Sequence, residues 1–181
     1  MMDADSSGGL NREQSARRAW LIAWSTILAC GSSLLSMTNV AHAAPPALPE
    51  VANLAADCAL AKERRVPMLL FFNRVGCPYC ERALREFLRP MANDPANAPR
   101  VLFRQVETNK PVKMVDFKGD ATTHRKFAAQ YKIKLTPTIW FVDGDGNGLA
   151  EPIVGLTTPD YYGYYLDKAI EESLAKIRTG A

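Results

Sequence analysis

The feature that most constrains the fold is a short apolar run that ends just before two closely spaced cysteines. Residues 66–73 read VPMLLFFN, which is too short for a core helix and has no polar alternation. Such a run is typical of a central strand buried on both faces. Cys77-Pro78-Tyr79-Cys80 follows and opens a predicted helix. The sequence therefore predicts a strand-to-helix junction that carries two thiols.

The remaining pattern predicts further strands alternating with helices. We expect strands at 101–106, 138–142 and 153–154 and helices at 50–65, from Cys77 to about 89, from Thr122 or Thr123 to 131, and at 159–178. This order predicts an α/β domain with a mixed central sheet of four to five strands, helices on both faces and an extra N-terminal helix. Pro90 is expected to end or kink its helix.

The spacing of the cysteine pair predicts redox chemistry. Free N–H groups at the start of a helix favour a thiolate, and in comparable sites the attacking thiol has a pKa of roughly 3.5 to 7.5. We assign Cys77 as the nucleophile and Cys80, one turn later, as the resolving thiol. Pro78 suits the first turn of the helix. Arg74 and Arg82 are near in sequence and would favour the thiolate further if they turn toward Cys77.

A structural zinc site and a fixed disulfide are the alternatives for this pair. Zinc needs two more ligands, and the predicted domain offers only Cys58 and His124, without a recognisable spacing. We therefore expect no metal and no organic cofactor. A copper chaperone that uses Cys77 and Cys80 as soft Cu(I) ligands remains a non-enzymatic alternative.

The N-terminal segment has the layout of a secretory signal peptide. Three arginines precede an apolar stretch at 20–30, and Ala41-His42-Ala43 precedes Ala44. We expect cleavage near Ala43, export to the periplasm and a soluble mature chain of about 138 residues. A retained anchor is disfavoured, because Gly, Ser and Asn interrupt the apolar run.

Two variants of the export signal stay open. Residues 17–21 resemble a twin-arginine signal, and residues 27–30 resemble a lipoprotein processing box. Both variants also export the chain. The predicted organisation is a signal peptide at 1–43, a Pro-rich leader at 44–49 and one domain at 50–181.

Composition excludes several classes of protein. The 181 residues are 48% hydrophobic and 23% charged, which excludes a disordered chain. The net charge of +3 gives no support for nucleic-acid binding. Four cysteines are too few for a disulfide-stapled scaffold, so sulfur chemistry is the better interpretation of the pair.

A second motif lies directly before the predicted strand at 138–142. It reads Leu135-Thr136-Pro137-Thr138, and a proline at this place suits a cis peptide bond. Together with the cysteine pair, it makes the chain resemble the thioredoxin superfamily from about 51 to 177. The resemblance implies that the proline loop faces the cysteines and that Thr136 and Pro137, with Pro78 and Tyr79, bind substrate.

The export signal and residues 115–119 are most similar to periplasmic thioredoxin-like proteins, including those of sulfur-oxidation operons. This resemblance implies a thiol:disulfide oxidoreductase that acts on disulfide-containing proteins or small thiols. Its redox partner would be a membrane or periplasmic electron donor or acceptor. A reductant or isomerase role is favoured, and a disulfide donor would use the same residues.

The chain departs from the superfamily at two positions. Cytoplasmic thioredoxins carry a buried Asp six residues before the first cysteine, where this chain has Phe71. They also carry a Trp directly before the first cysteine, where this chain has Gly76. Proton transfer to the resolving thiol must then use water, the substrate, or a carboxylate such as Glu81 or Glu86.

Four other features are assigned structural roles. Residues 143–148 resemble the start of a calcium loop, but Val154 occupies the position that needs a bidentate Glu, so we expect a hairpin turn. Cys58 lies on the apolar face of its helix and is expected to be buried and inert. His124 is expected on the surface. At least half of the tyrosines at 161–165 are expected to pack against the sheet.

Overall fold

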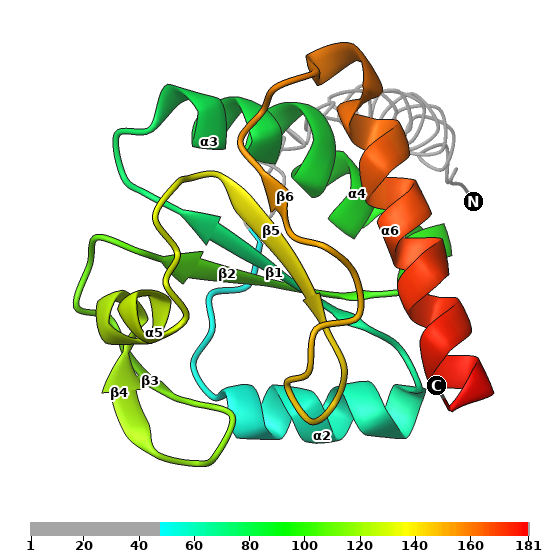
Figure 1. Ribbon diagram of the computed structural model, residues 1–181, viewed down its shortest axis with the longest axis horizontal. Coiled ribbons are helices and arrows are strands. Elements are labelled where there is room, and N and C mark those ends of the chain that lie inside the picture. Colours follow the sequence, from blue (N-terminus) through cyan, green and yellow to red (C-terminus); the bar gives the residue numbers. More distant parts are fainter. Residues whose placement is uncertain (1–47, 181) are drawn as a thin grey trace, which may run out of the picture. The chain divides into compact units, whose positions relative to one another are not determined.

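A mixed sheet with helices on both faces forms the centre of the computed structural model, which describes residues 48–180 (Figure 1). Its four strands are β1 (Met68–Asn73), β2 (Leu102–Glu107), β5 (Thr138–Val142) and β6 (Ile153–Val154), in the order β2-β1-β5-β6. β1 is parallel to β2, whereas β5 is antiparallel to both β1 and β6. The predicted α/β class and mixed sheet are confirmed.

β1 is the central strand, and each of its residues is buried. In the parallel ladder Phe71 pairs with Gln105 and Asn73 pairs with Glu107. Side chains alternate between the two faces of a strand. These four residues therefore share one face of the sheet, the face on which the helix after Cys77 packs.

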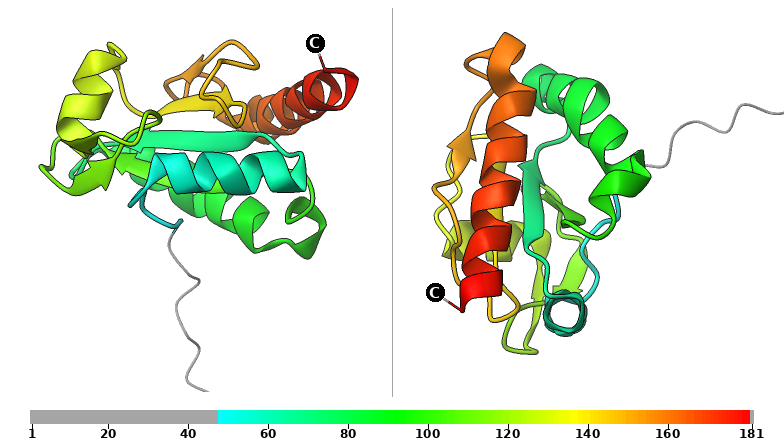
Figure 2. Two further views of the ribbon diagram at one scale, coloured as in Figure 1. Left: turned by 90° about the horizontal axis from the view of Figure 1, so that it is seen from below. Right: turned by 90° about the vertical axis from the view of Figure 1, so that its right-hand side faces the viewer.

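The helices cover the two faces in pairs (Figures 1 and 2). α2 (Leu54–Arg64) and α5 (His124–Gln130) lie on one face. The helix that begins with α3 (Pro78–Ala83) and ends with α4 (Arg89–Asn93) lies on the other, with α6 (Pro159–Thr179). This arrangement buries the sheet from both sides.

Aromatic contacts tie each layer together. On the α5 side, the Phe72 and Phe127 rings are stacked with centroids 6.2 Å apart. On the other side, Phe87 meets Tyr162 edge to face at 5.1 Å. Each buried aromatic side chain contributes roughly 1.5 to 3 kcal/mol through removal from water. The first contact holds α5 against the sheet, and the second holds the helix that carries the cysteines against α6.

The chain enters the domain as an extended segment and not as a helix. Glu50 forms a parallel bridge with Gln105, and the Gln105 N–H donates to the Pro49 carbonyl at 2.9 Å. Leu48 is buried. Residues 48 and 49, expected in the leader, thus belong to the sheet edge. The predicted helix at 50–65 begins later, as α2, with Asn53 as its N-cap.

The helix after the cysteines continues past Pro90, because the helix widens in the turn just before this proline. η1 (Leu84–Leu88) is a π-helical turn in which the Arg89 N–H bonds to the Leu84 carbonyl. A proline lacks the N–H and its ring collides with the preceding turn of a regular helix. The π turn makes room for the ring. The helix therefore extends to Asn93, beyond its predicted end.

Three short elements were not predicted. β3 (Lys113–Val115) and β4 (Ala121–Thr123) form a separate antiparallel pair, and η2 (Pro95–Asn97) is a single 3₁₀ turn. The expected signal peptide and most of the expected leader lie outside the described residues. Within those residues, no helix combines the length and apolarity that a membrane span requires.

Candidate active site

Cys77 occupies the N-cap of α3, directly after the central strand. Its sulfur accepts a hydrogen bond from the Cys80 N–H at 3.2 Å, and Pro78 takes the first helical position. Cys77 and Cys80 are joined by a disulfide with a Cα separation of 5.2 Å. A free N–H group of the first turn, that of Cys80, therefore points at the sulfur that we assigned as the nucleophile.

A tight turn carries the chain from β1 to Cys77. Gly76 has a φ of 76°, which a side chain would strain, and the Cys77 N–H bonds to the Arg74 carbonyl at 3.2 Å. The loop after β2 fixes this turn, because the Val75 N–H donates to the Asn109 side chain at 3.1 Å. The position of the disulfide thus depends on two neighbouring strand ends.

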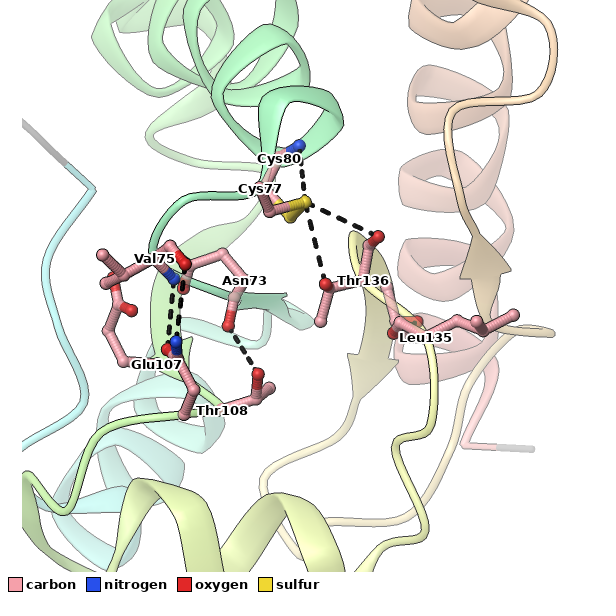
Figure 3. Close-up of a disulfide and its surroundings, with 10 residues drawn as sticks. Asn73, Val75, Cys77, Cys80, Glu107, Thr108, Leu135 and Thr136 are labelled. Carbon is pink, nitrogen blue, oxygen red and sulfur yellow. Dashed lines mark hydrogen bonds between the residues drawn. A yellow bond between two sulfur atoms is a disulfide. The ribbon is translucent and has the colours of Figure 1, made fainter.

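Thr136 faces the disulfide from the loop before β5 (Figure 3). Cys77 Sγ lies 3.7 Å from both the carbonyl and the hydroxyl oxygen of Thr136. The Thr136–Pro137 peptide bond is cis, and Pro137 is buried. The structure therefore brings together the two motifs that the sequence analysis singled out, although 59 residues separate Cys77 from Thr136.

The residues of the CPYC segment differ in exposure. Cys77 is partly exposed, whereas Cys80 keeps only 2% of its accessible surface. Pro78 is exposed, and Tyr79 is 65% exposed. An approaching disulfide can therefore reach Cys77, with Pro78 and Tyr79 at the rim, but cannot reach Cys80 directly.

Arg82 is engaged elsewhere on the helix surface. Its Nε lies 2.8 Å from a carboxylate oxygen of Glu86, and this hydrogen bond, with a second from Arg85, lowers the pKa of Glu86. Arg74 lies exposed in the turn. Of the two cations considered from the sequence, only Arg74 remains free of a described ion pair near the disulfide.

A buried polar cluster lies beneath the turn, and the sequence analysis missed it. The Asn73 side-chain amide donates to Glu107 Oε1 at 2.7 Å, and the Gln105 amide donates to the same oxygen at 3.1 Å. All three residues are at least nine-tenths buried. The signal that could have found them is the alternation of Gln105 and Glu107 on a strand that is otherwise largely apolar.

His124 is completely buried, so the prediction of a surface position is wrong. Its Nδ1 accepts from the Glu107 N–H at 3.0 Å, which leaves Nε2 to donate to the Val51 carbonyl at 2.7 Å. These two backbone groups would form the next rung of the ladder in which Gln105 bonds to Pro49. The imidazole therefore connects the Glu107 N–H to the Val51 carbonyl, in place of a direct hydrogen bond between these two groups.

Cys58 and the described carboxylates form no further reactive site. Burial, and next the nearby Asp57 charge, raise the pKa of Cys58 to about 11, in line with the prediction of a buried thiol. Among residues 48–180, no three His, Cys, Asp or Glu side chains lie close enough to hold a metal ion. Of the four tyrosines at 161–165, only Tyr162 is buried, which corrects the expectation of at least half.

A hollow of about 270 Å³ lies beside Thr136, on the α5 side of the disulfide. Its lining includes the cationic residues Arg74, Arg125 and Lys134. Near the disulfide, Tyr79 and Leu135 are each 65% exposed. The surroundings of the disulfide thus combine exposed apolar groups with positive charge.

The profile of the thioredoxin-like domain matches residues 54–170, which is more than half of the chain. The chain belongs to the thioredoxin-like family. Solved thioredoxins are similar at low identity. Mitochondrial thioredoxin 3 of Saccharomyces cerevisiae is 18% identical, with a TM-score of 0.47, over 69% of this chain and 94% of that one. The thioredoxin of Malassezia sympodialis is 16% identical, with a TM-score of 0.48, over 74% and 98%.

No curated protein matches this thioredoxin-like chain. Family membership and the Cys77–Cys80 pair at disulfide distance together support a redox oxidoreductase. They are also consistent with disulfide-containing proteins or thiols as substrates. The family does not by itself set the direction of electron flow.

Proposed function

We propose that the protein is an exported thiol:disulfide oxidoreductase that acts on protein disulfides or small thiols. The observation that carries the proposal is the placement of the Cys77–Cys80 disulfide, with Cys77 partly exposed against Thr136 and Cys80 buried behind it. This arrangement gives the two sulfurs different access to a substrate, and therefore different roles.

In the reducing direction, the Cys77 thiolate attacks a substrate disulfide and forms a mixed disulfide. The substrate chain lies along Thr136 and Pro137, between Tyr79 and Leu135. The Cys80 thiolate then attacks Cys77 Sγ, which restores the disulfide and releases the reduced substrate. No metal or organic cofactor takes part in these steps.

The exposed tyrosine and leucine fit the side chains of an extended protein substrate. The hollow lined by Arg74, Arg125 and Lys134 fits an acidic residue of that substrate, or the carboxylates of a small thiol. We place the protein in the periplasm because of the arginines, the apolar stretch and the Ala41-His42-Ala43 triplet at its N-terminus. Its redox partner is then a membrane or periplasmic donor or acceptor.

We favour a reductant or isomerase over a disulfide donor. We favour this direction because the single catalytic domain otherwise resembles thioredoxin. The export signal and residues 115–119 are most similar to periplasmic thioredoxin-like proteins, including those of sulfur-oxidation operons. A donor role requires the same residues and a higher, more oxidising reduction potential of the Cys77–Cys80 couple. The reduction potential of the Cys77–Cys80 couple distinguishes them, because a value near roughly −270 mV indicates a reductant and a value near roughly −120 mV indicates a donor.

The roles of the cysteines are tested by trapping. In Cys80→Ser the mixed disulfide on Cys77 cannot be resolved, so substrate proteins should accumulate as adducts on non-reducing gels. Cys77→Ser should trap none, because the remaining Cys80 is buried. Cys58→Ala is the matched control and should behave like the unsubstituted protein. Equal trapping by the Cys77 and Cys80 variants would contradict the assignment.

A further inference from the structure

Cys80 must lose its proton before it can resolve the mixed disulfide, because the thiolate is the nucleophile. Only 2% of its surface is accessible, and burial away from charge disfavours ionisation. Strand β1, which precedes the cysteines, has the fully buried Phe71 on this face, and a phenylalanine cannot accept a proton. A protein group that accepts this proton would therefore come from another element that reaches the same space.

The structure shows a pocket that contains both Cys80 and a buried carboxylate. It has a volume of about 190 Å³, and its lining includes Cys80, Asn73, Gln105 and Glu107. The ladder places Glu107 beside Asn73 on the face of the sheet that α3 covers. A pocket of this size has room for water molecules between a thiol and a carboxylate.

The Glu107 carboxylate is buried, and only one of its two oxygens is hydrogen-bonded. It is 5% exposed, and its Oε1 accepts both amide hydrogen bonds of the cluster. Its Oε2 is buried and, like Asn73 Oδ1 and Gln105 Oε1 in the same cluster, has no partner among the described residues. Buried polar atoms are nearly always paired, so an unpaired carboxylate oxygen beside a reactive thiol calls for a functional explanation.

The other charged groups around Glu107 are few. Arg74 and Glu81 also line the pocket, and both are exposed to solvent. His124 contacts the Glu107 backbone through Nδ1 and Val51 through Nε2, so neither ring nitrogen is free to take the proton. Glu86 lies in ion pairs with two arginines on the helix surface.

We propose that Glu107 is the proton acceptor for the resolving thiol, a role that rests on the proposed function. The Cys80 S–H proton passes to the Glu107 carboxylate through water in the pocket. The Cys80 thiolate attacks Cys77 Sγ, the Cys77–Cys80 bond forms and the mixed disulfide bond breaks. The substrate leaves as a thiolate. The two cysteines lose two electrons and the substrate disulfide gains them.

The test separates the two sulfur steps by stopped-flow absorbance with 5,5′-dithiobis(2-nitrobenzoate) as the probe. The purified reduced protein carries Cys30→Ser and Cys58→Ala, so that only the redox pair reacts. Attack by Cys77 releases the first aromatic thiolate, and attack by Cys80 releases the second. The rate of each phase is followed from about pH 6 to above the ordinary thiol pKa of about 8.5.

Glu107→Gln should slow the second phase roughly 100-fold near neutral pH, the loss typical of a missing general base. The first phase should stay within about twofold, and the second should recover as rising pH ionises Cys80 without help. Glu107→Asp, which keeps the carboxylate, should fall between the two. Circular dichroism confirms that each variant is folded, and if Glu107→Gln is not, the Asp variant decides.

Three results would overturn the assignment. The first is an unchanged second phase in Glu107→Gln, or in Glu107→Asp if only that variant folds. The second is equal slowing of both phases at every pH, which a purely structural role would give. The third is a slower second phase in Glu81→Gln together with an unchanged second phase in Glu107→Gln. Release of one aromatic thiolate per protein instead of two by the unsubstituted pair would instead contradict the proposed function. Glu151→Gln, an exposed carboxylate outside the pocket, is the control for charge loss.

Discussion

Replacement of His124 by leucine should destabilise the protein more than most single substitutions do. The change preserves bulk and apolar contact but removes both ring nitrogens. The Glu107 N–H and the Val51 carbonyl, now 3.0 and 2.7 Å from those nitrogens, then lose their partners. Both residues are buried, at 5% and 1% exposure, so water cannot easily replace the imidazole.

The size of the effect follows from the two backbone groups that His124→Leu leaves without hydrogen-bond partners. Each buried donor or acceptor left unpaired costs about 1 to 3 kcal/mol, so the pair predicts a loss of about 2 to 6 kcal/mol. A domain of this kind is stable by only about 5 to 15 kcal/mol. With a urea dependence of about 2 kcal/mol per molar, the unfolding midpoint should fall by roughly 1 to 3 M.

Urea unfolding of the oxidised protein, followed by circular dichroism, measures this loss. In His124→Asn the side-chain oxygen can replace Nδ1 and keep the bond from the Glu107 N–H. In His124→Gln the side-chain amide can replace Nε2 and keep the bond to the Val51 carbonyl. Each should lose less stability than His124→Leu. A loss below about 1 kcal/mol for His124→Leu would refute the bridging role, because it would mean that the two backbone groups find other partners.

Three further substitutions test other parts of the structure. Tyr162→Phe should raise the free energy of unfolding by about 1 to 3 kcal/mol, because the buried Tyr162 hydroxyl has no partner among the described residues; a loss of stability in thermal melts would contradict this. The pKa of Cys58 is raised from 9.0 to about 11, so stability should fall as pH rises between these values, and Cys58→Ala should remove that fall in pH-dependent urea titrations. Gly146→Ala should cost about 1 to 3 kcal/mol in urea unfolding, because Gly146 has a φ of 82° and the new Cβ would lie 2.9 Å from the Phe117 ring; an unchanged midpoint would contradict this reasoning.

Local pattern was enough to predict the sheet and the position of the redox pair. The run at 66–73 and the strand at 138–142 are continuous apolar segments, and the structure places β1 and β5 there. The N-cap position of Cys77 also follows from sequence, because Pro78 marks the first helical residue. These features depend on neighbours along the chain.

The missed features depend on contacts between distant segments. His124 is buried because it joins Glu107, 17 residues away, to Val51, 73 residues away, and no local pattern indicates that pairing. The strands β3 and β4 have three residues each, too few to show a period. The helix passes Pro90 because η1 widens before it, and that adjustment is not visible in the residue types.

The central claim is that Cys77 and Cys80 form a couple that exchanges electrons with thiols. The most direct measurement equilibrates the purified protein with dithiothreitol or glutathione buffers and counts reduced and oxidised Cys77–Cys80 by alkylation and mass spectrometry. The account predicts a reversible two-electron titration with a potential between roughly −270 and −120 mV. A pair that does not exchange with these thiols, yet binds Cu(I) tightly, would contradict it.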